Sequence, residues 1–165
     1  MKKIILILIL LLTLVSTAFA KIQVPEDNRW AYVSGNKTQE DTWMDLYTFE
    51  FGKSLDSDYR HAEHTFGRIW FMINKYSSDT RIVLFYEFDL QCHTARLLSA
   101  TSYDGNGNVL AVIPKSYTVQ AVVPGTNGET YFMIAEALEK IHTDKEMLNK
   151  FYIMSQEDSD KYRKL

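Results

Sequence analysis

The sequence predicts an α+β fold: a single curved antiparallel sheet of about six strands, with a C-terminal amphipathic helix packed on one face. Two observations predict it. From residue 30 to residue 123, apolar residues mostly recur with a period of two, which is typical of strands. From residue 126 the period becomes that of a helix. Because the strands precede the helix rather than alternate with it, we expect an antiparallel sheet covered by a helix.

The first twenty residues have the pattern of a secretory signal peptide. Two lysines precede an unbroken apolar run at residues 4–12, and Ala18 and Ala20 place small residues before a cleavage point. The apolar run is short for a membrane span, so we expect no membrane span after cleavage behind Ala20. The protein is then exported, to the periplasm or to the cell surface in association with the outer membrane.

The 165 residues divide into a signal peptide (1–20), an N-terminal linker (21–28), an α+β domain (29–154) and a polar C-terminal tail (155–165) that we expect to be frayed. The formal net charge is −3 for the whole chain, and loss of Lys2 and Lys3 with the signal makes it about −5. Mild acidity without an extended basic cluster argues against a nucleic-acid partner and against an anionic membrane surface.

The predicted strands are residues 30–33, 42–51, 66–75, 81–103 (one bent strand or two), 109–112 and 117–123. Segment 66–75 has apolar residues on both faces around Trp70, which predicts a central strand. In segment 81–103 the single cysteine, Cys92, shares a face with apolar residues, whereas His93 lies on the opposite face. We therefore expect Cys92 to be a buried, inert thiol with a structural role.

A turn and a capped helix complete the domain. Asp-Gly and Asn-Gly pairs within residues 104–108 supply the positive φ angles of a tight hairpin. Pro124 and Gly125 end the last strand, and Thr126 and Glu129 have the spacing of a helical capping box. Five apolar residues then follow helical spacing: Tyr131, Ile134, Ala135, Leu138 and Ile141. A second, short helix is predicted after residue 143.

Several short motifs follow one another along the chain: Trp30, the Trp-centred Ile69–Phe71, Cys92 followed by Arg96, the turn at Tyr103–Val109, and Val123–Glu129. Together, over about residues 29–141, they resemble the surface-adhesin protein E family of small exported Gram-negative proteins. The resemblance implies a curved antiparallel sheet with a C-terminal helix held against it. It also implies an adhesin that binds host extracellular-matrix or plasma proteins.

The resemblance has one departure. In such proteins a cysteine of the long strand commonly pairs with one in the helix, and Cys92 matches the strand position. Residues 129–142 contain no cysteine, so this chain lacks the bridge and its contribution of about 2–4 kcal/mol. Docking of the helix then depends on its apolar stripe.

His61 and His64 form the only close histidine pair and are the candidate metal ligands. Residues three apart share a face on a helical turn, where Asp56, Asp58 or Glu63 would complete a divalent metal site. The spacing is not that of a metalloprotease helix. The preceding residues are polar and typical of a turn, so a solvated loop is the main expectation for this segment, and a weak metal or pH-sensitive site is the alternative.

The sequence contains no catalytic pattern: no Gly-x-Ser-x-Gly elbow and no glycine-rich phosphate loop after a strand. We therefore expect no enzyme and no cofactor, with a hydrolase as a minor alternative. The leading prediction is an exported binding protein whose partner is a host matrix or plasma protein, or an envelope protein. The alternative is a periplasmic accessory protein that binds a small ligand or metal through the His61/His64 loop. A homodimer formed through a free sheet edge also stays open.

Overall fold

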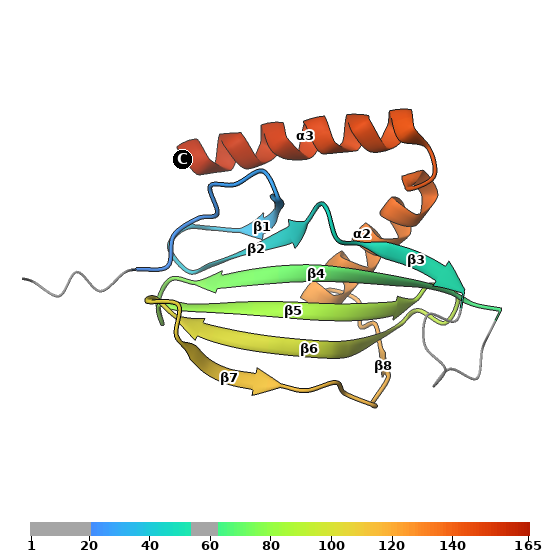
Figure 1. Cartoon of the computed structure of the whole chain (residues 1–165), viewed down its shortest axis with the longest axis horizontal. Coiled ribbons are helices and arrows are strands. Elements are labelled where there is room, and N and C mark those ends of the chain that lie inside the picture. Colours follow the sequence, from blue (N-terminus) through green and yellow to red (C-terminus); the bar gives the residue numbers. More distant parts are fainter. Residues whose placement is uncertain (1–20, 54–62) are drawn as a thin grey trace, which may run out of the picture.

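The computed structural model describes residues 21–53 and 63–165, which form one antiparallel sheet and two helices (Figure 1). The strands are β1 (Trp30–Gly35), β2 (Glu40–Asp45), β3 (Glu50–Lys53), β4 (Thr65–Lys75), β5 (Thr80–Asp89), β6 (Thr94–Asp104), β7 (Val109–Ile113) and β8 (Gln120–Ala121). The helices are α2 (Asn127–Ile141) and α3 (Lys145–Lys164). The predicted α+β fold is confirmed. The predicted signal peptide and His61 lie outside the described residues.

The eight strands occupy six positions, in the order β1-β2-β4-β5-β6-β7. Strands β2 and β3 pair with different parts of β4, and strands β7 and β8 pair with different parts of β6. The single strand expected at 42–51 is therefore two strands. The Asp45 side chain stabilises the turn between β2 and β3. Its carboxylate accepts hydrogen bonds from the backbone N–H of Tyr47 (2.8 Å) and from the hydroxyl of Thr48 (2.5 Å).

The segment 81–103 is also two strands, β5 and β6, joined by residues 90–93. Cys92 lies in this turn and is exposed, so the expectation of a buried thiol is wrong. The alternation of faces that predicted its burial stops at the end of β5. The last predicted strand, 117–123, contributes only the two residues of β8.

Helix α2 packs on one face of the sheet and forms the main core with it. The stacked rings of Phe71 on β4 and Tyr131 on α2 have centroids 4.2 Å apart. The buried core residues are Ala31, Met44, Leu46, Ile69, Phe71, Phe88, Tyr131, Phe132, Ala135 and Leu138. Three residues of the predicted helical stripe are therefore buried, and Phe132, which the stripe omitted, is buried with them.

The start of α2 carries the capping groups expected from the sequence. Thr126 is the N-cap, and its hydroxyl accepts a hydrogen bond from the backbone N–H of Glu129 (3.4 Å). The Glu129 carboxylate accepts one from the backbone N–H of Gly125 (2.7 Å), one residue before the cap. Gly125 has a φ of +77°, a conformation that glycine adopts without steric cost.

Helix α3 is much longer than the short second helix expected, and it covers the edge strand β1 (Figure 1). Residues 155–164 are helical, so the expectation that the polar tail at 155–165 is frayed is wrong. Ser159 and Tyr162 are buried within that segment, and the Tyr162 ring stacks on Tyr32 of β1 at a centroid distance of 4.0 Å. Ser159 and Tyr162 are three residues apart, so they lie on the same face of the helix. The helix docks through this face, although the usual sequence signal for a docked helix is an apolar stripe.

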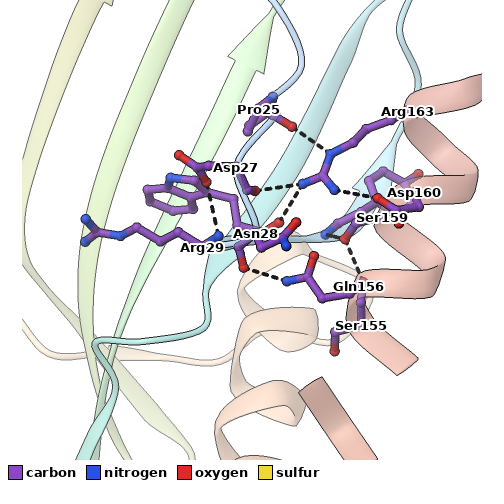
Figure 2. Close-up of polar contacts among 11 residues, drawn as sticks. Pro25, Asp27, Asn28, Arg29, Ser155, Gln156, Ser159, Asp160 and Arg163 are labelled. Carbon is purple, nitrogen blue, oxygen red and sulfur yellow. Dashed lines mark hydrogen bonds and ion pairs between the residues drawn. The ribbon is translucent and has the colours of Figure 1, made fainter. Parts of the chain in front are cut away.

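Within the predicted linker at 21–28, residues 25–28 are bound to α3 through backbone carbonyls (Figure 2), whereas Ile22 and Gln23 are hydrogen-bonded to Asp79 and Arg81 at the β4–β5 turn. The Arg163 guanidinium donates to the carbonyls of Pro25 and Asp27, each at 2.8 Å, and the Gln156 amide donates to Asn28 O.

Among residues 21–53 and 63–165, neither helix has the length and apolar content needed to cross a membrane.

Candidate functional sites

The two edges of the sheet differ in how they are covered. Strand β1 is covered by α3, and the backbone N–H of Tyr32 donates to the Ser159 hydroxyl (2.9 Å) in place of a neighbouring strand. On the opposite edge, β7 pairs with β6, and no other described strand pairs with it. All five β7 residues are exposed, and the exposed fraction of its four large side chains lies between 53% and 64%. This edge is available for pairing.

The turn that precedes β7 is held by Asp104. Its carboxylate accepts hydrogen bonds from the backbone N–H groups of Asn106 (2.9 Å) and Asn108 (2.8 Å), and from the Asn108 side chain (2.9 Å). The side-chain and backbone hydrogen bonds from Asn108 hold the pKa of the Asp104 carboxyl below its usual range. The turn fixes where the chain re-enters the sheet, and thereby sets the position of β7.

The chemistry of the β7 edge is unusual for an exposed strand. Its sequence, Val-Leu-Ala-Val-Ile, contains no charged residue. Its protection is limited to a bulge, where the pairing with β6 passes over Leu110, and to Pro114 and Lys115 immediately after the strand. Natural proteins commonly prevent strand pairing at such edges with charged side chains, bulges or a covering element. Exposed Tyr117 and Val119 continue the apolar surface beyond the strand. An extended apolar segment is therefore the chemistry that fits this edge.

A second candidate site lies at the β5–β6 turn, where three potential metal ligands meet. His64 precedes β4, Asp89 ends β5, and Cys92 lies in the turn. The His64 Nδ1 atom lies 2.8 Å from Asp89 Oδ2 and 3.6 Å from Cys92 Sγ. One ligand atom from each residue lies within 4.8 Å of the other two. The cluster thus combines nitrogen, oxygen and sulfur donors.

Backbone hydrogen bonds hold the turn in place. Asp89 Oδ1 accepts from the N–H groups of Gln91 (3.1 Å) and Cys92 (3.0 Å), while its Oδ2 faces His64. The N–H of Leu90 donates to Thr65 O (3.1 Å), and the N–H of Thr65 donates to the Gln91 side chain (2.6 Å). The two segments that carry the cluster are therefore bound to each other beside it.

The surroundings of the cluster lower the pKa of Asp89 and raise the pKa of Cys92. Burial alone would raise the pKa of the Asp89 carboxyl, but hydrogen bonds from His64 and from the Cys92 and Gln91 backbone outweigh it and lower the pKa. Desolvation of the thiol and the nearby Asp89 charge raise the pKa of Cys92. A nucleophilic cysteine needs the opposite shift.

The geometry also differs from that of a Cys-His-Asp relay. In such a relay the nucleophile and the carboxylate contact different nitrogens of the imidazole. Here Asp89 Oδ2 and Cys92 Sγ both approach His64 Nδ1. The arrangement suits binding of a cation better than activation of the thiol.

The structure thus brings His64 to two residues that the sequence did not link to it. Three acidic residues were expected to complete a metal site with the histidine pair. Asp56 and Asp58 lie outside the described residues, as does His61, and Glu63 is exposed and is not part of the cluster. The signal that would have found Asp89 is the pairing of β4 with β5, which places Asp89 opposite Phe66, two residues after His64. Trp70 lies elsewhere, half-buried and stacked on Phe85 at 4.3 Å.

No family model, curated protein or solved structure matches this chain. The resemblance to the surface-adhesin protein E family therefore stays a prediction.

Proposed function

We propose that this chain is an exported, non-enzymatic binding protein that takes up an extended segment of another protein at the β7 edge. The observation that carries the proposal is the uncharged strand β7, whose five residues are all exposed, on a sheet whose other edge is covered by α3. In strand addition, backbone hydrogen bonds supply affinity, and alternate side chains supply specificity.

The chemistry of the edge defines the partner. Apolar side chains on both faces of β7 favour a segment whose own residues are apolar and uncharged over the paired length. A second copy would bring the same net charge, about −5 without the signal segment, so a neutral or basic partner is favoured over self-pairing. The predicted export makes an envelope protein, or a host matrix or plasma protein, the partner to test.

The test compares residues 21–165 in three forms: unchanged, Val112→Lys, and Ile153→Lys. Val112 lies on β7, whereas Ile153 lies on α3 and is similarly exposed, so each lysine replaces a solvent-facing apolar side chain. Each form is passed over immobilised matrix and plasma proteins and over envelope extract. Any captured protein is then identified, purified and titrated against all three forms.

We expect Val112→Lys to weaken binding at least tenfold and Ile153→Lys to leave it unchanged, because a charge on the strand opposes edge pairing. Protection of β7 amides from hydrogen exchange in the complex would locate the contact. Equal binding by the two variants would contradict the proposal, and so would a failure of the unchanged form to retain any partner. A dimer that Val112→Lys converts to a monomer would assign the edge to a second copy instead.

A further inference from the structure

We propose that His64, Asp89 and Cys92 form a binding site for a divalent metal ion of borderline softness, with Zn²⁺ as the best fit. Thiolate, imidazole and carboxylate are the three ligand types that Zn²⁺ binds in proteins. The site differs from the histidine pair expected from the sequence, because two of its three ligands come from the β5–β6 turn. It does not depend on the β7 edge.

The distance between the sulfur and nitrogen ligands agrees with a tetrahedral ion, whereas the nitrogen and oxygen ligands lie closer together than such an ion requires. Zn–S and Zn–N bonds of about 2.3 and 2.05 Å place sulfur and nitrogen about 3.6 Å apart at the tetrahedral angle. The observed distance between Cys92 Sγ and His64 Nδ1 is 3.6 Å. Nitrogen and oxygen ligands of such an ion lie about 3.4 Å apart, whereas Nδ1 and Asp89 Oδ2 are 2.8 Å apart. Binding therefore requires His64 and Asp89 to separate by roughly half an ångström.

The charges also balance. An ion that binds both His64 Nδ1 and Asp89 Oδ2 displaces the proton shared at their 2.8 Å contact, and this proton moves to His64 Nε2 or to solvent, which leaves a neutral imidazole and an ionised carboxylate. Coordination by sulfur requires Cys92 to release its thiol proton to solvent. The thiolate and the Asp89 carboxylate then supply two negative charges to a doubly charged cation, so the occupied site is neutral. A neutral site avoids leaving an unpaired charge beside the buried Asp89 side chain.

The ligands are held before an ion arrives. Asp89, whose side chain is 8% exposed, is fixed by two backbone N–H groups of the turn, and the turn is bound to Thr65, which adjoins His64. Such outer contacts orient metal ligands and raise affinity by 10–100-fold in other sites, as an order of magnitude. Cys92 is exposed, so the ion enters from its side, and three protein ligands leave a fourth position for water.

The experiment uses residues 21–165, which contain every described strand and helix, under reducing conditions. Zn²⁺ is titrated by calorimetry, and Co²⁺ by absorption, because only thiolate-bound Co²⁺ gives a strong sulfur-to-metal charge-transfer band. The variants are Cys92→Ser, His64→Ala and the control His93→Asn. His93 is the adjacent histidine of the same turn, has a φ of 51° and is not in the cluster, and asparagine tolerates that φ.

We expect one ion per chain and a charge-transfer band for the unchanged protein and for His93→Asn. Cys92→Ser should lose the band and bind Zn²⁺ at least tenfold more weakly, and His64→Ala should weaken Zn²⁺ binding similarly. Because Cys92 is exposed, its replacement by serine should leave the circular dichroism spectrum unchanged.

Absence of the band in the unchanged protein would overturn the proposal. Equal Zn²⁺ affinity in the unchanged, Cys92→Ser and His64→Ala proteins would do the same. Binding that survives Cys92→Ser but is lost in a His61→Ala/His64→Ala protein would place the ion on the histidine pair instead. None of these outcomes bears on pairing at β7, which the Val112→Lys comparison tests separately.

Discussion

The carboxylate of Glu87 lies buried between two arginines on neighbouring strands. Arg68 Nε donates to Oε2, and Arg96 Nη2 donates to Oε1, each at 2.7 Å. The three residues face one another across β4, β5 and β6. Taking such charges out of water is costly, and pairing offsets that cost only while both signs are present. Removal of the central carboxylate would leave two guanidinium groups close together.

We therefore predict that Glu87→Gln lowers the free energy of unfolding by about 3–5 kcal/mol. The control is Glu50→Gln. Glu50 lies 3.7 Å from the same Arg68, but its side chain is 55% exposed, and its loss should change stability by less than about 1 kcal/mol. Urea unfolding followed by circular dichroism measures both variants. Similar losses in the two would show that burial of the Glu87 carboxylate is not what matters.

At the scale of secondary-structure elements, α3 substitutes for a missing strand. The Ser159 hydroxyl accepts a hydrogen bond from the β1 backbone at Tyr32 and donates one to Ser155 O (2.6 Å), so both of its roles are satisfied within the protein. In Ser159→Ala the Tyr32 N–H loses its partner beneath the helix. A partly buried, unpaired donor of this kind costs about 1–3 kcal/mol.

We predict that Ser159→Ala destabilises the protein within that range and speeds hydrogen exchange at the Tyr32 amide. Asp158→Ala is the matched control on the same helix. Asp158 is 65% exposed and pairs only with exposed Lys161 among the described residues, so its removal should change stability by less than about 1 kcal/mol. The exchange rate at Tyr32 is the deciding measurement, because a general loss of helix stability would alter neighbouring amides equally.

The elements that the sequence predicted well are those whose apolar residues recur with the period of a strand or a helix. Strand β4 and helix α2 bury apolar residues at regular spacing, so periodicity revealed both. Two of the errors arose where a polar side chain determines the local structure. Asp45 interrupts the strand predicted at 42–51, and Ser159 docks a segment that hydropathy alone indicates to be solvated.

The His64 cluster was only half predictable for a related reason. Spacing along the chain brings together residues a few positions apart, whereas Asp89 is 25 residues from His64. What joins them is the register of β4 against β5, which places Phe66 opposite Asp89. The hairpin at residues 76–79 sets that register, so a prediction that first paired the two strands would have found Asp89. It would not have found Cys92, which required knowing where β5 ends.

At the scale of the whole molecule, the two edges of the sheet differ in how they are covered. One edge is covered by α3, and on the other no described strand pairs with β7 (Figure 1). The residues of β7 are apolar and exposed. An uncovered strand is a template for pairing with another chain. Removal of α3 should therefore leave the edge strand β1 open to pairing with another chain, independently of β7. It should also expose the Tyr32 and Trp43 rings, which pack against Tyr162.

We predict that a chain ending at Thr143 self-associates even when it carries Val112→Lys, because the lysine blocks β7 but leaves β1 open. The full-length Val112→Lys chain should stay monomeric under the same conditions, since α3 covers β1 and the charge opposes pairing at β7. Sedimentation velocity over a range of protein concentrations distinguishes the two chains. A truncated chain that remains folded and monomeric would show that the β1 edge does not need α3 for protection. The helix would then serve chiefly to hold the segment at residues 25–28 through Arg163 and Gln156 (Figure 2).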